Sequence, residues 1–208
     1  MCRPYQYPPH VPRGRLLRTL RDMITPKAVE ELIHRRSSSL SIDRERPVDD
    51  SLIDRLAAVA QAAPNHGKTR PLRIAAVRGD ARLALGNAIG DAMAARGDAE
   101  NRVEKARTKY TRAPLVLVVA SAVGEDEHET RENEYSVAAG MQNALLLLES
   151  MGLISLWSSP NEGCNDAITS FCGFAPTDRV VGIFYVGWPQ RELPRKERPA
   201  PVVVRLGE

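Results

Sequence analysis

The sequence has little of what several classes of protein require. Its 208 residues contain three cysteines, Cys2, Cys164 and Cys172, with no C-x-x-C pair, and no apolar run approaches the ~18 residues that a membrane helix needs. Unpaired cysteines do not form a disulfide framework and suit a reducing compartment. We therefore expect a soluble, cytoplasmic protein that does not contact the membrane.

An excess of charge of one sign is also missing from most of the chain. The formal net charge is +3, but residues 1–22 carry five arginines against Asp22 alone. Taking these away from 29 basic and 26 acidic residues leaves 24 and 25, a net charge of −1 for the remainder. Because the basic character belongs to one end, we expect no nucleic-acid partner.

The first 22 residues differ in composition from the rest. They are rich in Pro and Arg and contain neither a serine nor an apolar stretch of secretory length, so they do not resemble a signal peptide. We expect residues 1–22 to be a disordered basic tail, with Met23 as an alternative translation start. Residues 23–208 have the length of a single domain.

Motifs of three common enzyme classes are absent. No G-x-S-x-G elbow indicates a hydrolase, and no G-x-G-x-x-G follows a predicted strand. The histidines, His10, His34, His66 and His128, lack metal-ligand spacing. We therefore expect no bound metal.

Helical and strand patterns alternate along the chain. Thr25 and Pro26 begin a helix over 26–35, and a second helix runs from Asp49 or Asp50 to about 63. One or two helices over 81–110 have modest apolar content, which suggests a mobile lid. Further patterns predict strands over 72–77, 115–120 and 180–186, helices over 132–151 and 166–171, and a possible edge strand over 202–204.

These elements predict an α+β domain of three layers, with a central mixed sheet flanked by helices. The helix over 132–151 is apolar on more than one side and needs more than one partner. Since two-fold dimers are the commonest oligomers, we expect it to pack on its own sheet and on a second copy of the chain.

Four polar or aromatic clusters stand at the ends of apolar elements: Arg35-Arg36-Ser37, the loop from Pro64 to Pro71, Trp157-Ser158-Ser159 and Gly187-Trp188-Pro189. Each has an ordinary structural explanation: a solvated basic helix end, an incidental loop histidine, or a core tryptophan. Arginine forks and serine hydroxyls are also the groups that bind a phosphate.

In this order the clusters resemble the nitroreductase family of FMN-dependent NAD(P)H oxidoreductases, in particular its short subgroup with an Arg-Arg-Ser start and a Pro-Asn/Asp-His loop. The resemblance covers about residues 26–190 and implies an α+β homodimer with FMN between the subunits. It implies that Arg35, Arg36 and Ser37 bind FMN, that His66 and Arg70 touch the flavin and its ribityl chain, and that Trp157, Ser158 and Ser159 lie against it. Lys196 and Arg198 match basic residues that reach the phosphate in longer relatives, and their role stays open.

The function implied is hydride transfer from NADH or NADPH through FMN to a small electron-poor acceptor such as a nitroaromatic, quinone or activated alkene, in a ping-pong cycle that needs no catalytic side chain. Leu72 stands where the family commonly has an aromatic residue, and Ser39 where many longer relatives have a basic one. Two alternatives are a flavin-binding or redox-sensing protein with little turnover and a cofactor-free dimeric scaffold.

Overall fold

The computed structural model describes residues 24–194 and 197–207. The predicted tail over 1–22 and Lys196 lie outside these residues. The helical elements are α2 (Pro26–Arg35), α3 (Ser51–Gln61), η1 (His66–Lys68), α4 (Ala81–Ala95), α5 (Glu100–Thr108), η2 (Lys109–Arg112), α6 (Glu127–Ser150) and α7 (Asn165–Cys172). The strands are β1 (Leu72–Arg78), β2 (Leu115–Ser121), β3 (Ile154–Ser158) and β4 (Arg179–Gly187).

The four strands form one sheet in the order β1-β2-β4-β3, and each pair of neighbours is antiparallel. The expected mixed sheet is therefore wrong for these strands. Helix α6 connects β2 to β3, and these two strands run in the same direction. They do not pair with each other, because β4 lies between them and pairs antiparallel with both. In the described part of the chain, parallel pairing is limited to a bridge between Ser38 and Ser155.

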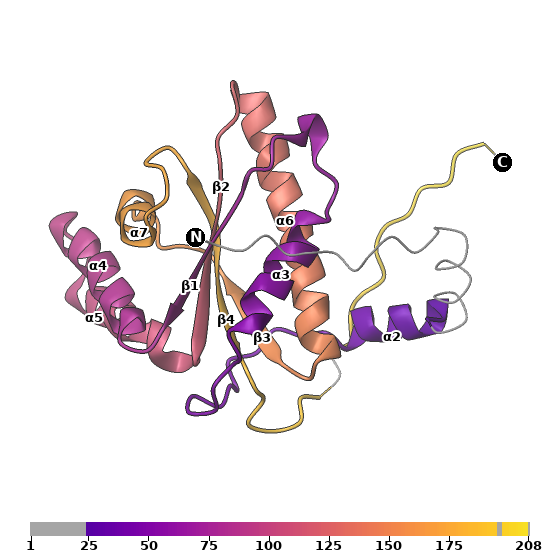
Figure 1. The fold of residues 1–208 in the computed structure, drawn as a ribbon, viewed down its shortest axis with the longest axis horizontal. Coiled ribbons are helices and arrows are strands. Elements are labelled where there is room, and N and C mark those ends of the chain that lie inside the picture. Colours follow the sequence, from indigo (N-terminus) through magenta and orange to yellow (C-terminus); the bar gives the residue numbers. More distant parts are fainter. Residues whose placement is uncertain (1–23, 195–196, 208) are drawn as a thin grey trace.

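The sheet lies between two layers of helices, as expected for three layers. Figure 1 shows α4, α5 and α7 on one side and α3 and α6 on the other. Every residue of β2 is buried, and alternate side chains enter opposite cores: Val116 and Val118 face one, and Leu115, Leu117 and Val119 the other. This period of two is what a strand covered on both faces requires.

The segment over 81–110 is part of the core, so the expected mobile lid is wrong. Leu85, Ile89 and Met93 recur every four residues on α4 and are buried against the sheet. At Gly86 an added Cβ would lie 2.0 Å from the backbone oxygen of Arg107, so the glycine lets α5 pack closely on α4. A narrow apolar stripe is enough to bury a helix even where its overall apolar content is modest.

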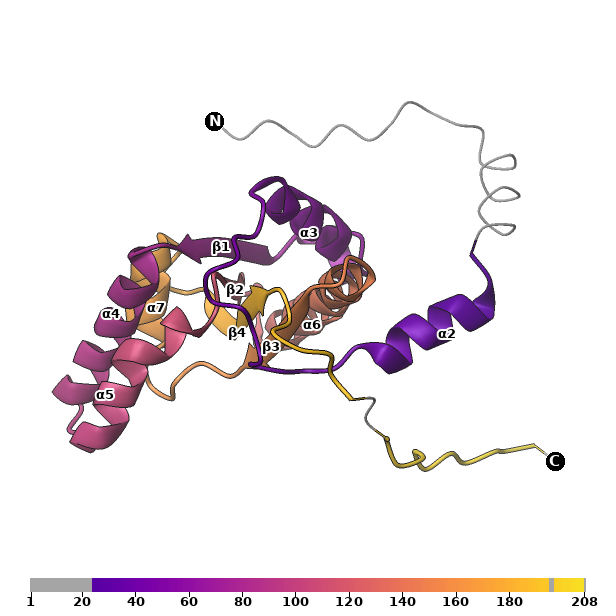
Figure 2. The same ribbon diagram turned by 90° about the horizontal axis from the view of Figure 1, so that it is seen from below.

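Two segments lie away from the core. Both views show α2 projecting from the body of the molecule (Figures 1 and 2), and none of its residues is buried. The predicted strand over 202–204 is wrong within this single chain, because these residues form no strand and Val202 is 94% exposed. Among the described helices, none is long and apolar enough to cross a membrane.

Candidate functional site

The first predicted cluster lies where α2 ends. Thr25 caps the start of α2 by accepting a 3.2 Å hydrogen bond from the Ala28 amide. At the other end, the Arg35 guanidinium pairs with the Glu149 carboxylate at 2.8 Å and donates to the Glu149 backbone oxygen at 3.3 Å. Arg35 thus ties α2 to the last turn of α6 and already has an anionic partner.

Arg36 has a cation beside it. The Arg198 guanidinium donates to the backbone oxygens of His34 and Arg36, at 3.0 and 2.7 Å. Burial, and then the charge of Arg198, lower the pKa of Arg36, while Glu149 acts in the opposite sense. The Arg36 guanidinium itself donates to the Ser38 hydroxyl at 3.4 Å, and a second cation in its neighbourhood favours an anion there. Arg198, left open by the sequence, is therefore placed with the predicted phosphate-binding residues.

A cavity of about 260 Å³ opens beside Arg35 and Ser37, the residues on either side of Arg36, and Glu149, Arg191 and Glu192 also line it. Arg35, Ser37, Leu153, Ile154 and Pro189 contribute to its lining, and Ser37 is almost fully buried. A groove of about 620 Å³ that shares Arg35 with the cavity continues between α2 and residues 192–193. A concave space lined by apolar side chains, a buried hydroxyl and charged groups of both signs has the mixed lining of a ligand pocket.

The second cluster is a strained loop before β1. Gly67, Lys68 and Arg70 have φ angles of 65°, 57° and 52°, in the left-handed region. For the two residues that are not glycine this conformation costs roughly 1–2 kcal/mol each. His66 is 84% exposed at the side chain and lies 3.8 Å from Glu132 of α6. Strain of this kind is often kept at ligand-binding loops.

Two asparagines that the sequence did not single out hold this loop. The Asn65 side chain bonds to the backbone of His66 and Arg70 and to the Thr69 hydroxyl. Thr69 in turn donates to buried Asn133 of α6 at 2.5 Å. The Asn65 bonds are of the local type common in turns, so its presence in the loop motif was a usable signal. Nothing in the local sequence indicates the bond between Thr69 and Asn133, 64 residues apart.

The third cluster lies at the end of β3. The Trp157 ring packs on Phe184 with centroids 4.8 Å apart, and its Nε1 donates to the Val181 oxygen at 3.4 Å. An added Cβ at Gly182 would lie 2.2 Å from that nitrogen, so the glycine makes room for the indole. Trp157 is therefore half-buried against the core, and Ser159, two residues further on, is exposed.

The fourth cluster has structural contacts. The Trp188 indole donates to the Pro47 oxygen at 3.1 Å, and the Arg46 guanidinium lies 3.8 Å from the centre of its ring. An added Cβ at Gly187 would lie 2.5 Å from Ile42. These contacts agree with the structural role expected for this turn.

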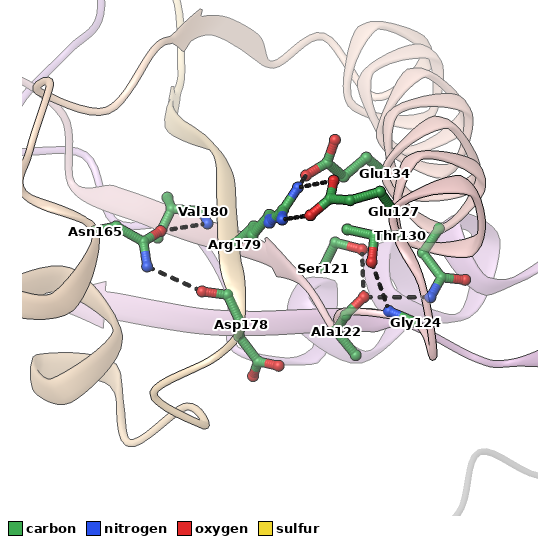
Figure 3. Close-up of polar contacts among 11 residues, drawn as sticks. Ser121, Ala122, Gly124, Glu127, Thr130, Glu134, Asn165, Asp178, Arg179 and Val180 are labelled. Carbon is green, nitrogen blue, oxygen red and sulfur yellow. Dashed lines mark hydrogen bonds and ion pairs between the residues drawn. The ribbon is translucent and has the colours of Figure 1, made fainter.

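Polar contacts close the end of the sheet where β2 finishes and β4 begins (Figure 3). Arg179 binds Glu127 through both terminal nitrogens, at 2.6 and 3.3 Å, and lies 3.6 Å from Glu134. The Thr130 hydroxyl accepts from the Gly124 amide at 2.9 Å. These bonds fix the first turns of α6, which carry Glu132 and Asn133, against the sheet.

One chain does not bring the predicted residues together. His66 contacts Glu132 and Arg35 contacts Glu149, 17 residues along one helix, which is about 25 Å. The strand after the loop, β1, and the strand that carries Trp157, β3, are at opposite edges of the sheet, three strand spacings or about 14 Å apart. By contrast, Ser38 bridges Ser155 in parallel, so Ser37 lies roughly 13 Å from Ser158 along β3.

The architecture defines an α+β protein with a strained loop before its first strand, and comparison with solved structures identifies its fold. The nitroreductase-like family protein of Bacillus cereus superposes with a TM-score of 0.75 at 23% identity, over 89% of this chain and 100% of that one. A nitroreductase of Bacteroides fragilis with bound FMN gives a TM-score of 0.69 at 20% identity, over 86% and 98% of the two chains. This chain has the nitroreductase fold.

Comparison of the sequence with protein-family models identifies the family. The model of the nitroreductase family matches residues 32–188, and the chain belongs to that family of oxidoreductases. It is 27% identical over 164 residues to YdjA, a candidate NAD(P)H nitroreductase of Escherichia coli K12, which is 78% of this chain and 88% of that protein. The resemblance drawn from the four clusters is confirmed.

Proposed function

We propose that this chain is an FMN-dependent oxidoreductase that passes a hydride from NADH or NADPH to a small electron-poor acceptor: a nitroaromatic, a quinone or an activated alkene. The observation that carries the proposal is the cavity lined by Arg35 and the buried Ser37, with Arg36 between them in the chain and Arg198 bonded to the Arg36 backbone oxygen. Among the solved structures of this fold are the FMN-bound nitroreductase of Bacteroides fragilis and an FMN-dependent nitroreductase of Mycobacterium smegmatis in complex with NADPH.

The residues present fit FMN from end to end. Arg36, Arg198 and Ser37 would hold the phosphate through charge-assisted hydrogen bonds. Ser158, roughly 13 Å further along β3, and Ser159 just after the strand would provide donors to the ring, a separation that suits a phosphate and ring joined by a ribityl chain. FMN supplies hydride acceptance and donation, so the chain needs no nucleophile or general base.

The chain's own contribution is electrostatic and steric. Arg70 near the ring would favour the negative charge that gathers at N1 and the C2 carbonyl on reduction, and in a site with little water this effect is large. Trp157 is half-buried and packs on Phe184, and it would support the wall of the site. The donor and the acceptor would use the same open face in turn, which is a ping-pong cycle.

The site is proposed to need two copies of the chain. Since the loop with His66 and Arg70 lies far from Ser37 and Ser158 on its own chain, it would reach the site of the partner. Val29 and Ile33, one turn apart on α2 and 42–43% exposed, leave an apolar face free for that partner. Subunits carrying Arg36→Ala and subunits carrying Arg70→Ala, each impaired separately at limiting FMN, should regain activity when unfolded together and refolded as a mixture. No recovery would contradict a shared site.

Steady-state oxidation of NADH and NADPH, with a quinone or a nitroaromatic as acceptor, tests the function. Parallel lines in double-reciprocal plots at several acceptor concentrations are expected from a ping-pong cycle. A yellow protein without turnover would support the alternative of a flavin-binding or redox-sensing protein. A colourless protein that takes up no added FMN would support the cofactor-free scaffold.

A further inference from the structure

The loop over 65–70 has an unusual backbone and no apolar anchor of its own. Gly67, Lys68 and Arg70 have positive φ angles, and each residue from His66 to Arg70 is exposed. Burial of the loop's own side chains therefore does not account for its conformation. Lysine and arginine have no intrinsic preference for the left-handed region, so other contacts must select it.

The Asn65 side chain supplies the first of these contacts. Its Nδ2 donates to the His66 backbone oxygen at 3.1 Å and to the Thr69 hydroxyl at 3.0 Å, and its Oδ1 accepts from the Arg70 amide at 2.8 Å. The nitrogen and the oxygen of one side-chain amide thus bond to opposite ends of the loop, at His66 and at Arg70. The amide closes the loop as a backbone turn would.

Asn133 anchors the closed loop to the domain. It is 2% exposed, its Oδ1 accepts from the Thr69 hydroxyl at 2.5 Å, and its Nδ2 donates to the Ala122 oxygen at 3.3 Å. The Ala122 amide donates in turn to the Pro71 oxygen at 2.8 Å. Both the middle and the end of the loop are therefore fixed to Ala122, one residue past β2.

We infer that Asn65 and Asn133 are positioning residues, which hold the loop in the strained conformation that presents Arg70 to the flavin. The inference rests on the proposed function. Without the Asn65 bonds, Lys68 and Arg70 would relax to negative φ, and the competent conformation would be only a fraction of the population. The apparent affinity for FMN falls by that fraction.

This role differs from that of a residue that only stabilises the fold. A structural residue, once replaced, lowers the melting temperature but leaves the bound flavin unchanged in those molecules that stay folded. A positioning residue also changes the reduction potential, because a misplaced Arg70 no longer favours charge on the reduced ring. The loss of a positioning residue can also be compensated by a second substitution that lowers the free-energy cost of the same backbone conformation.

The test compares Asn65→Ala, Asn65→Asp and the double variant Asn65→Ala with Lys68→Gly. Glycine adopts positive φ without a steric penalty, so Lys68→Gly should restore part of what Asn65→Ala loses. Asn65→Asp keeps the acceptor for the Arg70 amide and should be intermediate. For Asn133→Ala the matched control is Asn143→Ala. Asn143 lies on the same helix, but its side chain donates to the Val59 oxygen and not to the loop.

We expect Asn65→Ala and Asn133→Ala to raise the Kd for FMN at least tenfold and to make the flavin potential more negative, the same direction that we expect for Arg70→Ala. In protein free of cofactor, hydrogen exchange at the Arg70 amide should be faster in Asn65→Ala and in the double variant, because both lack the acceptor of that amide. Asn143→Ala should leave these properties as they are.

The outcomes separate this inference from the proposed function. If the unaltered protein binds no FMN, the proposed function fails, and the exchange experiment still tests the hold on the loop. If it binds FMN and Asn65→Ala binds equally well at the same potential, the positioning role is wrong. If Asn65→Ala weakens binding and Lys68→Gly recovers none of it, relief of backbone strain is not the cause, and the inference is overturned.

Discussion

Arg198 donates a 2.7 Å hydrogen bond to the backbone oxygen of Arg36, which ends α2. This contact joins residues 162 positions apart, and it sets a second cation beside the first. Arg35, the residue before, is instead occupied by Glu149. Adjacent arginines in one motif therefore have different partners, and the structure predicts different consequences of replacing them.

Arg36→Ala should raise the Kd for FMN about ten- to a hundredfold, the loss of one hydrogen-bonded charge at roughly 1.5–3 kcal/mol. Arg198→Ala should act in the same direction. Arg35→Ala should have a smaller effect on FMN, and because this ion pair is at the surface, it should cost no more than about 1 kcal/mol of stability. Quenching of FMN fluorescence on titration measures all three. An equal rise in the Kd for FMN in Arg35→Ala and Arg36→Ala would contradict the claim that Arg36 binds the phosphate and Arg35 pairs with Glu149.

Alkaline pH should destabilise the fold through two stacked tyrosines. Tyr110 and Tyr185 have ring centroids 6.0 Å apart; burial raises the pKa of Tyr185 to about 12 and that of Tyr110 further. Below pH 10 both rings are neutral whether folded or not. Between pH 10 and 12 the unfolded chain loses the Tyr185 proton and the folded chain keeps it, so stability falls as pH rises.

Urea unfolding at pH 8 and pH 11 measures this effect. Tyr185→Phe should reduce the loss of unfolding free energy between pH 8 and pH 11. Tyr135→Phe, at an exposed tyrosine of α6, should leave that loss unchanged. The Tyr110 hydroxyl is buried with no hydrogen-bond partner among the described residues. Tyr110→Phe should therefore leave stability at pH 8 unchanged or raise it by about 1 kcal/mol. A large loss at pH 8 would show that this hydroxyl has a partner.

Gly140→Ala should separate α6 from α3. An added Cβ at Gly140 would lie 2.4 Å from the backbone oxygen of Ala60, which cannot move without shifting α3. Overpacking of this kind costs about 1–3 kcal/mol. Gly90→Ala is the matched control in α4, because its Cβ would meet the side chain of Arg107, which can rotate. Thermal unfolding should show the larger loss for Gly140→Ala; the reverse order would contradict the tight contact.

Ile33→Glu should dissociate the proposed dimer. The side chain lies on the free apolar face of α2, and a charge there would have to be buried in the interface. Sedimentation or light scattering should then give a monomer, with loss of FMN because the site is shared. Leu83→Glu, at an exposed apolar residue of α4, should remain a dimer and keep FMN. A monomeric unaltered protein that binds FMN would exclude the shared site.

Local signals predicted much of the fold. Thr25 and Pro26 gave the bounds of α2, since capping and a fixed φ act within one turn. The apolar run from Leu115 predicted the buried central strand, because a strand covered on both faces has no polar positions. Features set by distant contacts were not predictable: β4 between β2 and β3, and burial of the helices over 81–110.

The candidate site shows the same limit. The residues of the clusters were visible in the sequence, and family resemblance gave them a role. Their separation on one chain, the different partners of Arg35 and Arg36, and the hold of Asn133 on the loop depend on pairs between 64 and 162 positions apart. No spacing rule along the chain encodes such pairs.

The central claim is that bound FMN accepts hydride from a nicotinamide in this protein, and anaerobic titration of the purified holoprotein tests it most directly. On stepwise addition of NADH or NADPH, the visible flavin absorption should bleach in proportion to the donor added, with one equivalent per flavin, and return on addition of a quinone. A flavin that stays oxidised with both donors would contradict the account.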